Sequence, residues 1–167
     1  MEKNNLRDIA LKSIDETIFY PPQGQTRLRS MIETRPDWCV SRQRVWGVPL
    51  PLFVSKKTGQ PLRDKNIINR IADIYEKEGS NTWFTEDPQR FLGDEYSIND
   101  YEQVKDVVEV WFDSGSTHAF CLEQREDLKW PASMYLEGSD QHRGWFHSSL
   151  LEACGTRGRA PFENILS

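Results

Sequence analysis

The residues best suited to chemistry in this 167-residue sequence form one dense cluster, Glu137 to Trp145. A short apolar segment, 133–136, precedes the cluster, and apolar residues recur at helical spacing after it. The cluster therefore occupies a turn between a strand and a helix, which is where open α/β sheets bind ligands. Carboxylates, amides and glycines crowd into this turn, a combination that a packed core seldom needs.

Each polar residue of the turn has a chemical use and a structural alternative. Glu137 directly follows the strand, so its carboxylate can pair with a ligand ammonium or, equally well, form an internal salt bridge. Gly138 permits either the close approach of a ligand or a positive φ. Asp140 and Gln141 can hydrogen-bond ribose hydroxyls or an amino group. Taken singly, these two residues are better explained as the first residues of a helix.

Histidine and cysteine give weak signals for catalysis or metal binding. His142 is a poor candidate for a general base or metal ligand, because the chain has only three histidines and no metal-like spacing to cysteine. A polar or adenine-proximal role for His142 is as well supported as catalysis. The three cysteines lie far apart without a CxxC, which predicts no disulfide framework, no zinc site and a reducing, cytoplasmic location.

Two tryptophans are expected at the same sheet edge. A strand is predicted over Val104–Phe112, ended by Asp113-Ser114-Gly115, with a helix over Ser116–Gln124. Trp111 then closes a strand and Trp145 opens a helix. Their rings can line one apolar pocket, or they can belong to the core, at even odds.

The rest of the chain alternates helical and extended patterns. Apolar positions predict a helix from Leu6 to Ile14, stopped by 21–24, and a second helix over Gln25–Thr34. The segment Trp38–Val54 reads as an extended or irregular connection, because it contains two prolines. A small hairpin is predicted near 52–62, around the turn Lys56–Gly59.

The predictions continue towards the end of the chain. Asp64 is expected to cap a helix that ends near Gly79. The apolar stripe predicted for this helix comprises Ile67, Ile68, Ile71, Ile74 and Tyr75. No firm prediction is made for 83–100. The last helix is expected to end at Cys154, with Gly155 as its stop, before a strand that begins near Asn164.

Charge and motif content exclude several functions. A net charge of −5 and a pI near 5.3 argue against bulk electrostatic binding of DNA or RNA. Local basic groups that can form a small patch are Arg27, Arg29, Arg35, Arg42 and Arg44. No secretory signal or long apolar run is visible, so no membrane partner is predicted. A Walker loop, a nucleophile elbow, GxGxxG and HExxH are all missing. Their absence argues against a P-loop kinase, a serine hydrolase, a typical dehydrogenase and a zincin.

Three blocks taken together resemble class I isoleucyl-tRNA synthetases. They are WCVSRQRVWGVPLP (38–51), DVVEVWFDSGSTHAF (106–120) and YLEGSDQHRGWFHSSLL (135–151). The resemblance implies an α/β fold: part of a Rossmann-type catalytic domain with an α+β connective insertion. On this pattern residues 1–103 are the end of the insertion, and 104–167 are part of the second half of the catalytic domain, truncated at the C-terminus.

The resemblance also implies a reaction and a site. The intact enzyme would activate isoleucine with ATP and Mg to isoleucyl-adenylate, then transfer it to tRNA(Ile). Glu137 matches the family position that contacts the aminoacyl-adenylate. The residues implied to contact its ribose and aminoacyl part are Gly138, Asp140 and Gln141. The rings implied to border the isoleucine side chain are Trp111 and Trp145.

Departures from the family pattern limit these implications. The HIGH block, the editing module and the KMSKS loop are missing, so the chain is expected to be an internal fragment that is catalytically inert by itself. The connective hairpin has Ser55–Gly59 where some relatives carry zinc-binding cysteines, which predicts no zinc. Alternatives are a non-catalytic adenylate- or tRNA-binding module and a folding unit without ligand affinity.

Overall fold

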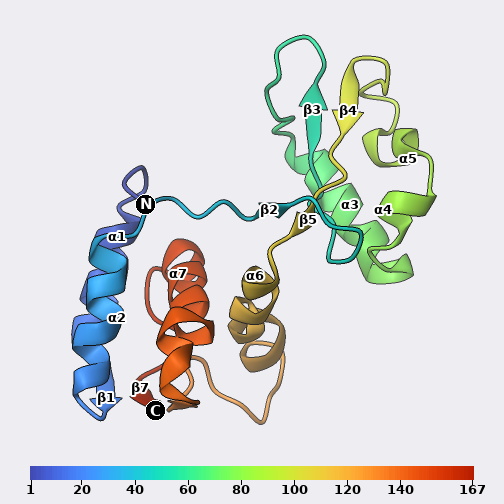
Figure 1. Ribbon diagram of the computed structural model, residues 1–167. Coiled ribbons are helices and arrows are strands. Elements are labelled where there is room, and N and C mark those ends of the chain that lie inside the picture. Colours follow the sequence, from blue (N-terminus) through green and yellow to red (C-terminus); the bar gives the residue numbers. More distant parts are fainter. The chain divides into compact units, whose positions relative to one another are not determined.

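The computed structural model describes residues 1–167, which divide into two compact units (Figure 1). The sheet unit combines Met1–Val40 with Val110–Ser167, and the nested unit is Ser41–Glu109. The predicted division after residue 103 differs from this arrangement. Residues 1–40 pack with the C-terminal part of the chain, because a strand near residue 20 pairs with the last strand.

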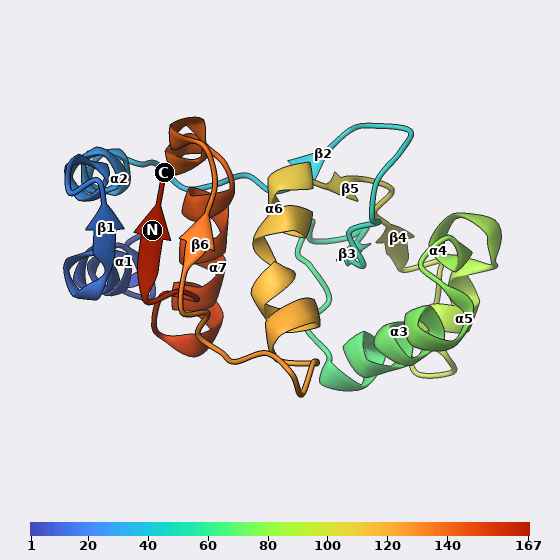
Figure 2. The same ribbon diagram turned by 90° about the horizontal axis from the view of Figure 1, so that it is seen from below.

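A three-stranded parallel sheet organises the sheet unit (Figure 2). Its strands are β1 (Ile18–Tyr20), β6 (Tyr135–Leu136) and β7 (Asn164–Leu166). β7 lies in the middle, and its buried Ile165 stands opposite Phe19 of β1 and Tyr135 of β6. A helix connects β6 to β7, as the crossover between two parallel strands requires. The predicted α/β class is confirmed.

Helices supply the rest of the core of the sheet unit. They are α1 (Leu6–Glu16), α2 (Gln23–Glu33), α6 (Val110–Gly115), the π-helix η1 (His118–Leu122), the 3₁₀ helix η2 (Ser139–Arg143) and α7 (Trp145–Arg157). Ile14 of α1, Leu28 of α2 and Leu150 of α7 are fully buried in one cluster with Ile165. The two predicted N-terminal helices are confirmed, and α2 begins two residues early, at Gln23.

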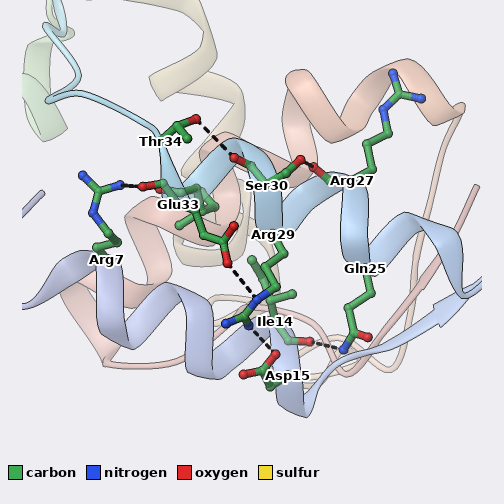
Figure 3. A network of polar contacts seen from close by, with 10 residues as sticks. Arg7, Ile14, Asp15, Gln25, Arg27, Arg29, Ser30, Glu33 and Thr34 are labelled. Carbon is green, nitrogen blue, oxygen red and sulfur yellow. Dashed lines mark hydrogen bonds and ion pairs between the residues drawn. The ribbon is translucent and has the colours of Figure 1, made fainter.

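Polar contacts join α1 to α2 (Figure 3). Arg29 of α2 makes ion pairs with Asp15 of α1 and, one turn along its own helix, with Glu33. Gln25 donates a 3.1 Å hydrogen bond to the carbonyl of Ile14 near the end of α1. One member of the predicted basic patch is therefore neutralised by two carboxylates.

The last helix is longer than predicted. α7 runs through Gly155 to Arg157, and Gly158 ends it with φ +75° and a 3.1 Å bond from its N–H to the Cys154 carbonyl. The predicted stop at Gly155 is wrong, because a left-handed residue is needed where the helix ends and Gly158 provides it. Gly155 lies inside the helix, where a Cβ would meet Leu6 at an ordinary 3.7 Å.

The strand predicted over Val104–Phe112 is also wrong for most of its length. Only Val107–Val108 pair, as β5, and the chain then turns into helix α6. The apolar residues that favoured a strand, Trp111 and Phe112, are partly exposed. Packing decides the outcome: Gly115 brings α6 so close to α7 that a Cβ there would lie 3.0 Å from the Ser148 carbonyl carbon.

The nested unit is a small α+β structure with its own core. Its strands are β2 (Ser41–Arg42), β3 (Phe53–Ser55), β4 (Tyr101–Gln103) and β5, and β2–β5 and β3–β4 pair antiparallel. Its helices are α3 (Lys65–Glu78), α4 (Thr82–Thr85) and α5 (Pro88–Leu92). Trp83 is 1% exposed at the centre, and its Nε1 donates to the Val104 carbonyl.

Local predictions for the nested unit are largely confirmed. Asp64 caps α3 by accepting a 2.8 Å bond from the Asn66 N–H, and Gly79 follows the helix. The chain reverses at 56–59, where the Ser55 N–H bonds the Gln60 carbonyl. Ile68 was expected in the buried stripe but is 52% exposed, because the buried face of α3 is centred on Ile67 and Ile71.

Candidate functional site

The candidate site begins at the carboxyl edge of the parallel sheet. The N–H of Glu137 bonds the Leu166 carbonyl at 3.2 Å, so this residue continues the pairing of β6 with β7 before the chain leaves the sheet. The Glu137 side chain is exposed, and its Oε2 accepts only a 3.3 Å bond from the adjacent Gly138 N–H. The predicted order of strand, polar turn and helix is present, with η2 inserted in the turn.

Gln141 ties the turn to the following helix. Its Oε1 accepts a 2.8 Å bond from the Trp145 N–H, the first of α7, and its Nε2 donates to Asp140 at 3.1 Å. A Cβ on Gly138 would lie 2.6 Å from Asp140 Oδ1, so glycine gives this carboxylate room to fold back over the turn. Asp140 remains exposed beside Glu137 in sequence, whereas Gln141 is partly buried.

The two predicted tryptophans come together at Gly144. Trp145 stacks on Tyr135 with ring centroids 4.0 Å apart, and its Nε1 donates to the Ser114 carbonyl at 3.0 Å. The outer edge of Trp111 lies against Gly144, where a Cβ would be 3.0 Å from Cη2. Trp111 is 41% exposed, so the ring is not a core residue. α6 and α7 thus present two indole rings next to the polar turn.

His142 has a structural role beneath the turn. It is 1% exposed, its Nδ1 lies 2.8 Å from the Ser139 carbonyl, and its ring contacts Phe19 and Phe146. A Cβ on Gly24 of α2 would lie 2.8 Å from the His142 Nε2. The imidazole therefore packs in the core, away from any ligand at the exposed carboxylates.

Sequence reasoning missed two buried titratable groups on α7. Burial, assisted by the negative charge of Asp113, raises the pKa of Glu152 to about 8, and its Oε1 lies against Gly115 without a hydrogen-bond partner. Burial lowers the pKa of His147 to about 4, with Arg35 contributing. The sequence does carry a signal of this burial. Residues 145–154 include few charged side chains, which is typical of a helix covered on several sides.

The nested unit has concavities of a different character. One of about 850 Å³ is lined by polar and charged residues including Lys56, Asp94, Glu95 and Asp100. Across the chain no three histidine, cysteine, aspartate or glutamate side chains converge as a metal site requires. No helix has both the length and the apolar character needed to cross a membrane.

Comparison with known proteins decides the family. The model of the family described as tRNA synthetases class I (I, L, M and V) matches residues 1–167. The chain belongs to the class I tRNA synthetases. The resemblance of the three sequence blocks is thereby confirmed, and the parallel sheet is the fold expected of the catalytic domain of such a synthetase.

Three relatives of this class I synthetase chain are all named isoleucine–tRNA ligase. An isoleucine–tRNA ligase of Pelagibacter ubique is 71% identical over 167 residues, which are 100% of this chain and 18% of the relative. Those of Brucella abortus and Caulobacter vibrioides are 59% and 52% identical, again over 100% of this chain and 18% and 17% of the relative. The chain thus spans about a fifth of the length of these relatives.

Proposed function

We propose that this chain supplies one wall of the aminoacyl-adenylate pocket in an isoleucine–tRNA ligase. The observation that carries the proposal is the meeting of Trp111 and Trp145 at Gly144, directly after the turn that exposes Glu137 and Asp140. Apolar rings beside exposed carboxylates suit a ligand with a hydrophobic side chain next to an ammonium group. An aminoacyl-adenylate of isoleucine has both.

Each residue of the wall then has a defined task. The Glu137 carboxylate pairs with the isoleucine ammonium and orients the amino acid. Asp140 hydrogen-bonds the ribose, and Gly138 lets the ligand approach the backbone closely. Gln141 contacts the ligand through the second N–H of Nε2, because its Oε1 is engaged by the Trp145 N–H and its first N–H by Asp140. Trp111 and Trp145 border the side chain.

The chemistry assigned to these residues is binding and orientation. In the intact protein an oxygen of the isoleucine carboxylate attacks the α-phosphorus of ATP, pyrophosphate leaves, and the aminoacyl group then passes to tRNA(Ile) with release of AMP. Holding the amino acid in place converts a bimolecular step into an effectively unimolecular one. We assign no magnesium or zinc ligand to this chain. That the hairpin at Ser55–Gly59 binds no zinc remains a prediction.

The domain assignment is part of the same proposal. The nested unit, 41–109, corresponds to the connective insertion, and the sheet unit corresponds to part of the Rossmann-type domain. This revises the expected boundary at residue 103, because the first forty residues belong with the parallel sheet. The proposal includes a cytoplasmic location and no binding to DNA or to membranes.

A chimaeric enzyme tests the proposed function. This chain replaces the matching segment of the Pelagibacter ubique isoleucine–tRNA ligase, and isoleucine-dependent pyrophosphate exchange is measured. We expect exchange in the chimaera but none from the chain alone. Glu137→Gln should lower kcat/KM for isoleucine about 10–100-fold, the loss expected for one hydrogen bond to a charged group.

Glu163→Gln is the matched control for Glu137→Gln. Glu163 is an exposed glutamate beside β7 at the opposite, amino-terminal edge of the sheet, and it pairs only with Lys129 at 2.9 Å. Its replacement should leave exchange within about twofold, because exposed ion pairs contribute little. Equal losses in both variants, or a chimaera that activates valine or leucine instead of isoleucine, would refute the proposal. A chain that binds an isoleucyl-adenylate analogue tightly without such activity would favour the non-catalytic module.

A further inference from the structure

Gly144 lies against the ring of Trp111 and immediately precedes Trp145 in the chain. It is buried between η2 and α7. A Cβ at this position would lie 3.0 Å from Cη2 and 3.1 Å from Cζ3 of Trp111. These separations are shorter than ordinary van der Waals contact, so the Trp111 ring rests on the glycine Cα with no space for a methyl group.

Two contacts fix the relation between the rings. The Ser114 carbonyl of α6 accepts the hydrogen bond from Trp145 Nε1, and Trp111, one turn earlier on the same helix, rests on Gly144. Tyr135 stacks on the Trp145 ring, with the ring centroids 4.0 Å apart. Because Trp145 is anchored on two sides, a group added at residue 144 would displace Trp111 rather than Trp145.

We propose that Gly144 is a specificity-determining positioning residue, which sets the gap between Trp111 and Trp145 and so the fit of the amino-acid side chain. The inference rests on the proposed function, since it takes those rings as the walls of the isoleucine pocket. Gly144 itself touches no substrate and acts through Trp111. Pushing Trp111 away from residue 144 widens the gap beside Trp145.

A wider gap should penalise isoleucine more than valine. Isoleucine has one methylene more than valine, and discrimination of this pair by isoleucyl-tRNA synthetases is itself the standard example of the limit of about 10–200-fold for one methylene. Contacts with this methylene are the first lost when an apolar wall retreats. Discrimination between the two amino acids therefore reports on the gap, whereas general destabilisation lowers both activities together.

The test compares Gly144→Ala with Gly155→Ala in the chimaeric enzyme. For Gly144→Ala we expect KM for isoleucine to rise with a smaller change in kcat, and the isoleucine-to-valine ratio of kcat/KM to fall about fivefold or more. Gly155 lies within α7, the helix that begins directly after Gly144, and a Cβ there meets Leu6 at an ordinary 3.7 Å. Its replacement should leave the ratio within about twofold. An unchanged ratio in Gly144→Ala would overturn the inference.

A rescue variant separates the Trp111 contact from the second neighbour of Gly144. A Cβ would also lie 2.5 Å from Gln141 Oε1, so Gly144→Ala disturbs the cap of α7 as well. Trp111→Phe removes the outer ring edge that the new methyl group meets. We expect Gly144→Ala/Trp111→Phe to lose less than the product of the two single losses, a coupling that a double-mutant cycle measures.

The outcomes distinguish this inference from the proposed function. If the unsubstituted chimaera shows no isoleucine-dependent exchange, the proposed function fails. If it is active but the losses of the two substitutions multiply independently, only the role of Gly144 fails. If Gly144→Ala does not fold, recovery of folding and exchange by Trp111→Phe supports the inference, and failure of the double variant overturns it.

Discussion

Two turns of this molecule use glycine for opposite reasons. Gly59, in the turn after β3, has φ +68° and no atom within 4 Å of the position of a Cβ. Gly144 has φ −121°, outside the left-handed region, but a Cβ there would press on Trp111 and Gln141. The first glycine serves the backbone conformation and the second serves close packing. Only the second type marks a place where side chains of the candidate site are brought together.

The helices of the two units differ in the same way. α3 buries a single face around Ile67 and Ile71, whereas α7 is buried continuously from Phe146 to Cys154. Among the polar groups of the two helices, the carboxylates and lysines of α3 are exposed. On α7, Glu152 and His147 lie in the core with shifted pKa values. Substitutions in the sheet unit should therefore cost more than chemically similar ones in the nested unit.

The largest effect is expected at Gly115. Gly115→Ala places a Cβ 3.0 Å from the Ser148 carbonyl carbon, and because backbone cannot yield as a side chain does, α6 must move away from α7. The free energy of unfolding should fall by about 3 kcal/mol, the upper end for over-packing. Urea unfolding measures the loss. A loss no larger than that of Gly59→Ala would contradict the contrast between the two kinds of glycine.

The second effect depends on pH. The unfolded chain releases the Glu152 proton above its ordinary pKa of 4.5, whereas the folded chain keeps it until about pH 8. The free energy of unfolding therefore falls as pH rises from 4.5 to 8. Glu152→Gln keeps the shape without the titration, so it should be more stable than the unsubstituted chain at pH 8, on the order of 2 kcal/mol.

Urea titrations at a series of pH values check the prediction for Glu152. The advantage of Glu152→Gln should shrink to nearly nothing about one pH unit below 4.5, where the glutamate is protonated in both states. Glu123→Gln is a suitable control. Glu123 is exposed, and the Arg157 guanidinium lowers the pKa of its carboxyl rather than raising it. A constant advantage at all pH values would show that packing, not the buried proton, is responsible.

A smaller effect is expected at the cap of α3. Asp64→Ala removes the 2.8 Å bond to the Asn66 N–H and the bond from the Tyr96 hydroxyl. A lost N-cap costs about 1 kcal/mol, which circular dichroism during urea unfolding can resolve. Asp64→Asn keeps the cap and should recover most of this loss. If it recovers nothing, the Tyr96 contact rather than the cap stabilises the nested unit here.

The smallest effect is expected for Gly59→Asn. Asparagine tolerates the left-handed conformation, and the space around residue 59 is open. The change in the free energy of unfolding should be below about 0.5 kcal/mol, with Gly59→Ala costing about 1 kcal/mol. Thermal unfolding of the two variants tests this order. Similar losses for both would mean that the conformation is not what glycine provides.

Features encoded locally were predictable from the sequence. The capping residue Asp64, the apolar face of α1 and the strand–turn–helix order around Glu137 each depend on a few neighbouring residues. The two tryptophans were placed at one edge by the same reasoning, although Trp111 reaches it from a helix rather than a strand.

Features that depend on distant contacts were not predictable. Strand-forming residues at 110–112 become helical because Gly115 packs on α7, and no local pattern reveals that neighbour. The pairing of β1 with β7 assigns residues 1–40 to the sheet unit. The burial of Glu152 was not predicted, since it arises from α6, a helix whose first half had been predicted as a strand.

The strand order β1–β7–β6 has a consequence for the time course of synthesis. Within this three-stranded sheet the central strand is made after both of its neighbours, so neither β1 nor β6 can pair with β7 until Asn164–Leu166 have been made. The nested unit is continuous in sequence and its core is complete once residue 109 is available. We therefore expect it to acquire protease resistance on the ribosome well before the turn at Glu137 gains its sheet.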